Sequence, residues 1–138
     1  MILFVRRAMA RFRQLRPKVV ENLLPEDCIF CKIVADKSPA EILYRDDLVT
    51  AFRDIHPAAP VHILIVPNKH IPSIKELTEE DESLIGHLHL VAKQIAVEEG
   101  IADKGYRLIT NTGHDGGQVV YHLHLHLIGG KALAFHRY

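Results

Sequence analysis

The sequence predicts an α+β fold in a single domain. Five short runs, at residues 42–44, 48–53, 62–66, 106–110 and 118–128, carry β-branched or alternating side chains, and one long helical pattern at 78–100 separates the third from the fourth. The runs follow one another in an order that looks antiparallel, with the helix between strands, which is typical of the α+β class. A chain of 138 residues with 48% hydrophobic content can bury one core.

The first residues differ in charge from the rest of the chain. Residues 1–20 carry a formal charge of +6 and no acid, which leaves a charge of −6 on the remainder. We expect a basic N-terminal arm at 1–25 and a folded domain at 26–138. A basic, acid-poor start is compatible with an organelle transit peptide. The stretch lacks serine, however, and we prefer a short helical arm on a cytoplasmic protein.

Composition excludes several classes of partner. An acidic body argues against nucleic acid as the main ligand. No apolar run approaches the roughly 20 residues that span a bilayer, so we expect no membrane partner. Two cysteines are too few for the disulfide framework of a small secreted protein.

The two cysteines form a Cys-x-x-Cys pair, Cys28 and Cys31. Such a pair can be a redox dithiol, half of a zinc site, or two buried thiols. A thioredoxin-like dithiol needs a preceding strand, and the residues before Cys28 predict none. A zinc site needs two more ligands, and histidines are plentiful in this chain.

The middle of the chain predicts three strands and a helix. Residues 42–44 and 48–53 form two strands around a turn at 45–47, and residues 62–66 form a third between two prolines. Thr78 with Asp81 resembles a capping box at a helix start. Gly100 suits the helix end, and the helical spacing appears in four apolar residues, Leu84, Leu88, Val91 and Ile95.

Within residues 121–128, positions 122–127 alternate strictly between histidine and leucine. Because neighbouring side chains on a strand point to opposite faces, this pattern predicts a row of histidines on one face and leucines on the other. Such a row can hold a metal, or one imidazole can be a nucleophile that the others orient. The loop before it, residues 111–118, contains paired glycines that let backbone N–H groups approach a phosphate. Together they indicate chemistry at phosphorus.

The histidine row resembles the motif of the histidine triad family, and the glycine pair after it is similar to the Hint branch. The resemblance runs from about Asp27 to Gly130 and includes several further segments in the same order, at residues 28–33, 52–55, 60–62, 69–71 and 105–107. It implies a five-stranded antiparallel sheet with helices, and a homodimer whose two sheets join into ten strands. It also implies an enzyme that binds purine nucleoside monophosphates and hydrolyses nucleoside phosphoramidates or related nucleotidyl conjugates.

The resemblance also assigns roles to residues. His124 matches the nucleophile that forms a nucleotidyl-histidine, His126 matches a group that contacts phosphate and leaving group, and His62 matches an outer supporting histidine. Asp54 matches the carboxylate that accepts the ribose hydroxyls. The matched walls of the base pocket are Ile29, Phe30, Ile33, Phe52 and Ile55, and the matched phosphate positions are Asn111, Gly117, Gln118 and Val119.

In zinc-bearing members of the family a cysteine pair at this place joins two histidines. The resemblance therefore implies a structural Cys₂His₂ zinc site made of Cys28, Cys31, His70 and His122. This assignment engages the first histidine of the triad with zinc and leaves His124 free for chemistry.

Two departures leave the leaving group open. Val119 stands where the Hint branch commonly has serine, and the tail after Gly130 lacks the usual Trp-Pro-Pro ending. One alternative is a Fhit-like dinucleoside polyphosphate hydrolase, against which the glycine pair argues. The others are a nucleotide-binding interaction protein with little turnover and a zinc-stabilised scaffold.

Overall fold

The computed structural model describes residues 25–135. The predicted arm at 1–25 therefore lies outside the described residues, apart from Pro25. The transit-peptide alternative and the cytoplasmic location, which both depend on that arm, stay predictions. The described helices and strands are α2 (Ile29–Val34), β1 (Ile42–Arg45), β2 (Val49–Arg53), β3 (Val61–Pro67), α3 (Glu82–Glu98), β4 (Tyr106–Ile109) and β5 (Leu125–Gly129).

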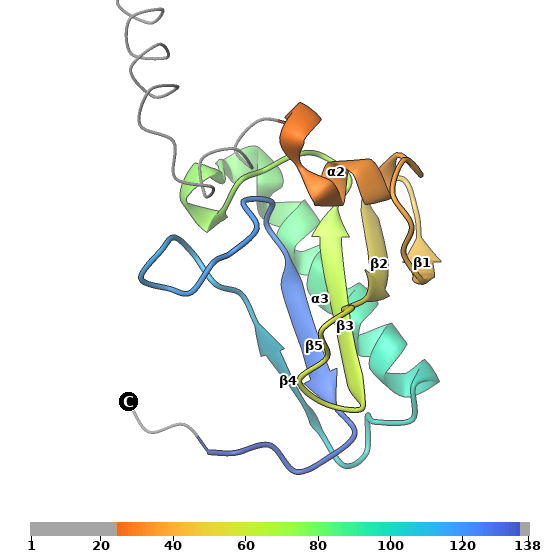
Figure 1. Ribbon diagram of the computed structural model, residues 1–138. Helices are drawn as coiled ribbons and strands as arrows, with labels where there is room; N and C mark the ends of the chain where they lie inside the picture. The colour runs from red at the N-terminus through yellow and green to blue at the C-terminus, as the bar shows by residue number, and fades with distance from the viewer. Residues whose placement is uncertain (1–24, 136–138) are drawn as a thin grey trace, which may run out of the picture.

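The five strands form one antiparallel sheet in the order β1-β2-β3-β5-β4. In Figure 1, α3 crosses behind the sheet and α2 lies in front of its upper end. The predicted α+β class and five-stranded antiparallel sheet are confirmed. Both β1 and β4 are edge strands of this sheet.

Each face of the sheet has its own apolar cluster. The cluster on the α3 face contains buried residues of the helix together with Ile63, Ile65, Leu125 and Leu127. On the α2 face, Phe30 and Ile33 pack with Phe52, Leu64 and Val66. Strand β3 therefore contributes to both clusters through alternate residues, as expected for a central strand that is buried on both sides.

Strand β5 is shorter than the sequence predicts, because residues 118–124 are not part of it. In the observed register Ile65 of β3 faces Leu125, so continued pairing would join Val66 to His124 and then Pro67 to Leu123. Proline has no backbone N–H to donate to a ladder, and pairing ends there. Leu123 instead donates its N–H to the carbonyl of Ile71, at 2.7 Å.

Helix α3 has the predicted signals at both ends. The N–H of Thr78 donates to the carboxylate of Asp81 at 3.0 Å, and the expected capping box forms at the 3₁₀ turn Glu79–Asp81 that leads directly into α3. At the other end Gly100 has a φ of +73°, and the N–H groups of Gly100 and Ile101 bond back to the carbonyls of Val97 and Ala96. This is a Schellman motif. No helix within residues 25–135 has the length and apolar character that a membrane crossing requires.

Replacing two glycines of this region by alanine should have opposite effects on stability. Gly100→Ala should lower the free energy of unfolding by about 1 kcal/mol, because alanine is strained in the left-handed conformation. Gly86→Ala should raise it by about 0.5–1 kcal/mol, since Gly86 lies inside α3 and nothing lies within 4 Å of an added Cβ. Urea unfolding of both variants measures the difference. Shifts of the same sign would contradict this account of the helix end.

Candidate functional site

The histidines of the 121–128 segment lie on the α2 face of the sheet. Leu123, Leu125 and Leu127 are buried in the α3 cluster, as the alternating pattern predicts. The alternation therefore continues beyond the end of the regular strand. His122 is fully buried and His124 is only 7% exposed, so this row lies beneath other side chains of the α2 face.

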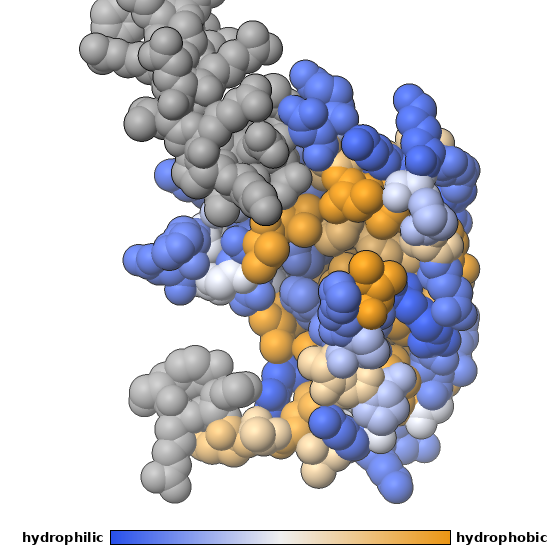
Figure 2. All heavy atoms as spheres, viewed as in Figure 1, coloured by the Kyte–Doolittle hydropathy of each residue, from blue (hydrophilic) through white to orange (hydrophobic). Residues whose placement is uncertain are grey.

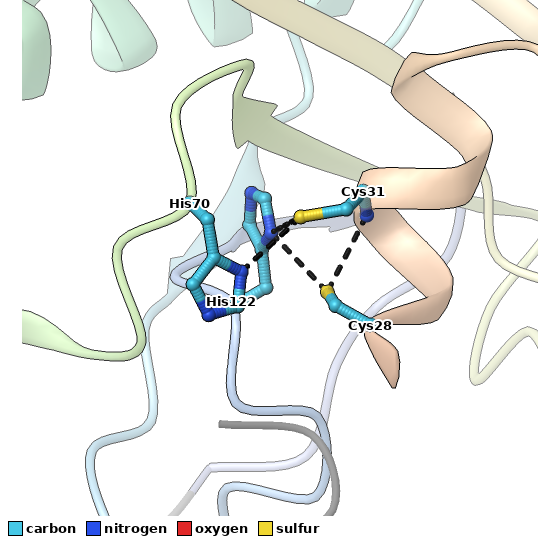
Figure 3. Close-up of side chains that lie close together, drawn as sticks. All are labelled: Cys28, Cys31, His70 and His122. Atoms are coloured by element: carbon cyan, nitrogen blue, oxygen red, sulfur yellow. Dashed lines mark hydrogen bonds between the residues drawn. The ribbon is translucent and has the colours of Figure 1, made fainter. Parts of the chain in front are cut away.

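His122 lies beside the two cysteines and His70 (Figure 3). Its Nδ1 atom is 3.4 Å from the Sγ atoms of both Cys28 and Cys31, and Nδ1 of His70 is 3.2 Å from Sγ of Cys31. Cys28 precedes the first turn of α2 and accepts the N–H of Cys31 at 3.4 Å. The short helix thus brings both sulfurs to one point, in front of the end of β3.

This arrangement fits a tetrahedral metal ion. Zinc bond lengths of about 2.3 Å to sulfur and about 2.0 Å to nitrogen place neighbouring ligand atoms about 3.5 Å apart. The observed sulfur–nitrogen distances of 3.2–3.4 Å agree with that spacing. Nε2 of His122 donates to the carbonyl of Pro67 at 2.7 Å, so its Nδ1 carries the lone pair that a metal requires.

Burial shifts both kinds of ligand toward their neutral forms. Burial, together with the neighbouring Cys28, raises the pKa of the Cys31 thiol to about 12. Burial likewise lowers the pKa of His122 to about 4. A metal ion would favour the thiolate and use the neutral imidazole, so binding would release protons from the cysteines.

His124 has one ring nitrogen bonded to the backbone and the other available. Its Nδ1 donates to the carbonyl of His122 at 2.6 Å, which places the lone pair on Nε2. The ring of Phe30 packs edge-on against the imidazole, with 5.1 Å between centroids. Burial lowers the pKa of His124, so the ring is neutral at pH 7. A neutral imidazole with a free lone pair can act as a nucleophile.

A second group of polar side chains adjoins His124. The ring of His126 lies 4.8 Å from the ring of His124, and its Nδ1 is 2.9 Å from Nε2 of His62. Asp54 completes the group, with Oδ2 at 3.4 Å from Nε2 of His62 and Oδ1 accepting the N–H of His56. The Asp54 side chain is 18% exposed, so it is not a solvated turn residue.

The residues expected to line a base pocket divide into two sets. Phe30, Ile33 and Phe52 are buried together in the cluster on the α2 face. Ile29 and Ile55 lie at the surface, 39% and 82% exposed. Figure 2 shows apolar side chains gathered around α2 and continuing down the same face between hydrophilic ones.

The side chain of Gln118 closes the glycine-rich loop at residues 111–118. Its side-chain oxygen accepts the N–H of Gly113 at 2.9 Å, and its nitrogen donates to the carbonyls of Pro72 and Val120. Gly117, with a φ of +81°, turns the chain just before it. The buried Gln118 amide thus stabilises the loop, and its contact with substrate stays a prediction, as does that of Asn111. Val119 is 76% exposed beside it.

Sequence patterns did not reveal the backbone groups of the site. The carbonyls of Pro67 and His122 each accept a ring N–H, and the N–H of Ala58 donates to Nδ1 of His62 at 3.0 Å. A backbone group carries no residue-type signal. Only the prolines around Ala58 and at the end of β3 indicated that these segments are irregular.

Comparison with known proteins gives consistent matches along most of the chain. A family model described as "Scavenger mRNA decapping enzyme C-term binding" matches residues 27–135. The "Purine nucleoside phosphoramidase" of Escherichia coli K12 is 54% identical over 110 residues, which cover 80% of this chain and 92% of that protein. An "Uncharacterized HIT-like protein" of Synechococcus elongatus is 53% identical over 81% of this chain and 97% of its own length.

Solved structures agree with the fold. A "Histidine Triad Protein" from Clostridium difficile superposes with a TM-score of 0.79 at 45% identity, over 80% of this chain and 96% of that one. A "HIT family hydrolase" from Legionella pneumophila superposes with a TM-score of 0.77 at 44% identity, over 78% and 96% of the two chains.

Proposed function

The chain belongs to the histidine triad family, and from this membership we propose that it is a hydrolase of purine nucleoside phosphoramidates or related nucleotidyl conjugates. The single observation that carries the proposal is the available Nε2 lone pair of His124, beside a second imidazole and a buried aromatic cluster. The similarity to the purine nucleoside phosphoramidase of E. coli supports the choice of substrate class.

The reaction proceeds in two displacements at the α-phosphorus. The Nε2 lone pair of His124 attacks phosphorus while the bond to the leaving amine breaks, and the amine departs with that electron pair and takes up a proton. In the resulting nucleotidyl-imidazole, Nδ1 of His124 keeps its proton and still donates it to the carbonyl of His122. This hydrogen bond stabilises the positive charge of the substituted ring. Water then attacks phosphorus, breaks the bond to Nε2, and releases the nucleoside monophosphate and a proton.

Substrate is held by the two ends of the site. Asp54 accepts the ribose hydroxyls, and a deoxyribose substrate would lose one of these hydrogen bonds, so the site favours ribose. Phe30, Ile33 and Phe52 supply apolar contact for the base, extended at the surface by Ile29 and Ile55. The loop at 111–118 approaches the phosphate, with His126 on its other side.

The identity of the leaving group depends on the Val119 region. Valine has no hydroxyl to bond a leaving amine, so this chain's preference can differ from that of enzymes with serine there. The 54% identity to a phosphoramidase nevertheless favours that reaction over dinucleoside polyphosphate hydrolysis. Turnover also distinguishes the enzyme from a nucleotide-binding interaction protein or a scaffold.

We further propose that zinc occupies the cluster of Cys28, Cys31, His70 and His122 as a structural ion. Four protein ligands leave no open position for substrate, as is usual for structural rather than catalytic zinc. The ion would join α2 to the end of β3. It would also fix His122, whose carbonyl orients the nucleophile.

A homodimer is the third part of the proposal. Strand β4 is an open edge of the sheet, and pairing with β4 of a second copy would give the ten-stranded sheet that the family resemblance implies. Two apolar side chains on the same face of α3, Leu90 and Val97, are 65% and 62% exposed. Burial of such side chains would stabilise the pair.

Replacing His124 should abolish the covalent route while leaving nucleotide binding intact. We expect His124→Ala to hydrolyse a fluorogenic adenosine phosphoramidate at the background rate and to bind AMP normally, because Asp54 and the base walls are unchanged. His89→Ala, at an exposed histidine of α3, is the matched control and should keep full turnover. Mass spectrometry after brief incubation should locate an acid-labile adenylyl group on His124. A label on another residue, or full turnover by His124→Ala, would refute the mechanism.

Zinc should be present at about one ion per chain when the protein is purified without added metal, as one tetrahedral site requires. Cys31→Ser should lose the ion. Its thermal unfolding temperature should fall clearly, whereas turnover per folded molecule should fall much less. Elemental analysis and calorimetry measure the two effects. Stably folded, metal-free protein with both cysteines freely alkylated would remove the zinc proposal.

Dimerisation should be visible by sedimentation at micromolar concentration. The double variant Leu90→Glu/Val97→Glu should raise the dissociation constant by at least about tenfold, since it places charges on an apolar contact. Lys37→Glu, at an exposed position after α2, is the control for a change of charge alone. A wild-type monomer at these concentrations would rule out the proposed dimer.

A further inference from the structure

The hydrogen bond between Ala58 and His62 determines where the proton of His62 lies. The backbone N–H of Ala58 points at Nδ1 of His62, with 3.0 Å between the nitrogens. Because a backbone N–H can only donate, Nδ1 must be the acceptor. The neutral ring of His62 therefore carries its proton on Nε2.

The same reasoning extends to His126. Nε2 of His62 lies 2.9 Å from Nδ1 of His126, and only one proton can lie between them. Since that proton belongs to Nε2 of His62, Nδ1 of His126 accepts and the proton of the His126 ring lies on Nε2. Asp54 Oδ2, at 3.4 Å from Nε2 of His62, is a more distant acceptor for the same proton.

This chain of bonds also opposes a positive charge on either ring. A charged His62 would aim an Nδ1 proton at the N–H of Ala58. A charged His126 would aim an Nδ1 proton at the N–H of His62. Burial, followed by the neighbouring His124 and His62, also lowers the pKa of His126 to about 4.

We propose that the N–H of Ala58, acting through His62 as a positioning residue, holds His126 as a neutral imidazole that presents its Nε2 proton to the transferred phosphoryl group. This inference rests on the proposed function. His126 is then a fixed hydrogen-bond donor and keeps its proton through both displacements. Within residues 25–135 no group is hydrogen-bonded to Nε2 of His126, so this donor is available to substrate.

The two neighbouring rings thus present opposite groups to the phosphate. The carbonyl of His122 gives His124 a lone pair on Nε2, and the N–H of Ala58 gives His126 a proton on Nε2. The lone pair attacks phosphorus while the N–H stabilises charge on a phosphoryl oxygen. A donor already oriented for that charge needs no reorganisation during the reaction.

Nitrogen-15 NMR of the uniformly labelled full-length protein at neutral pH tests the proton positions directly. Two-bond correlations between ring protons and ring nitrogens distinguish the two neutral forms of histidine. Loss of signals in His62→Gln and His126→Gln assigns the peaks. We expect both residues to carry the proton on Nε2 only. An Nδ1 proton on His126, a charged ring, or averaging between the two neutral forms would overturn the inference.

A pair of substitutions tests the function of this arrangement. In His62→Gln the amide nitrogen reaches the place of Nε2 and can still donate to His126. In His62→Asn the amide oxygen reaches the place of Nδ1 and can bond Ala58, but nothing reaches His126. Glutamine should keep kcat within about threefold, whereas asparagine should lower it by about tenfold at unchanged KM, the loss of one hydrogen bond.

The outcomes separate the inference from the proposed function. Equal losses of kcat in His62→Gln and His62→Asn, with equally lowered unfolding temperatures, would indicate a merely structural role and overturn the inference. If the wild type turns over no phosphoramidate, the proposed function fails, while the NMR result still decides the proton positions. If turnover is normal and the NMR shows an Nδ1 proton on His126, only the inference fails.

Discussion

The site depends on one buried hydrogen bond, from Nε2 of His122 to the carbonyl of Pro67. A fully buried imidazole needs a partner for its N–H, since an unmet donor costs on the order of 1–3 kcal/mol. Pro67 is the last residue of β3. The ring of His122 therefore donates to a carbonyl at the point where the pairing of β3 with β5 ends. The position of His122 in turn places its Nδ1 beside the two cysteines and its own carbonyl beside the ring of His124.

Much of this arrangement could be predicted from the sequence. Alternation at 121–128 correctly separated the leucines from the histidines, and the position of Gly100 identified the end of α3. The extent of β5 could not be predicted from the residues of that strand alone. It depends on Pro67, more than fifty residues earlier, whose missing N–H matters only in the observed register. Strand length is in such cases a property of the pair of strands.

The side chains around His124 were predicted better than the interactions that orient them. The Cys-x-x-Cys pair, His70 and His122 are brought together as the family resemblance implied. Gln118, in contrast, bonds only backbone groups in the structure, which a motif match could not reveal. Proton positions on the histidines depend on the backbone of Ala58, His122 and Pro67, and any residue type except proline could supply the N–H at position 58.

The contact between Cys28 and His122 joins residues separated by 94 positions in the chain. A helix of six residues is too short to be stable alone, and the cysteines of α2 can meet His122 only after the ribosome has made the last part of the chain. At a synthesis rate of roughly 5–20 residues per second, that delay lasts on the order of 5–20 s. During this interval neither thiol has its contact with His122. Completion of the chain is thus the event that brings His122 to the cysteines, and the ring of His124 acquires its orientation at the same moment.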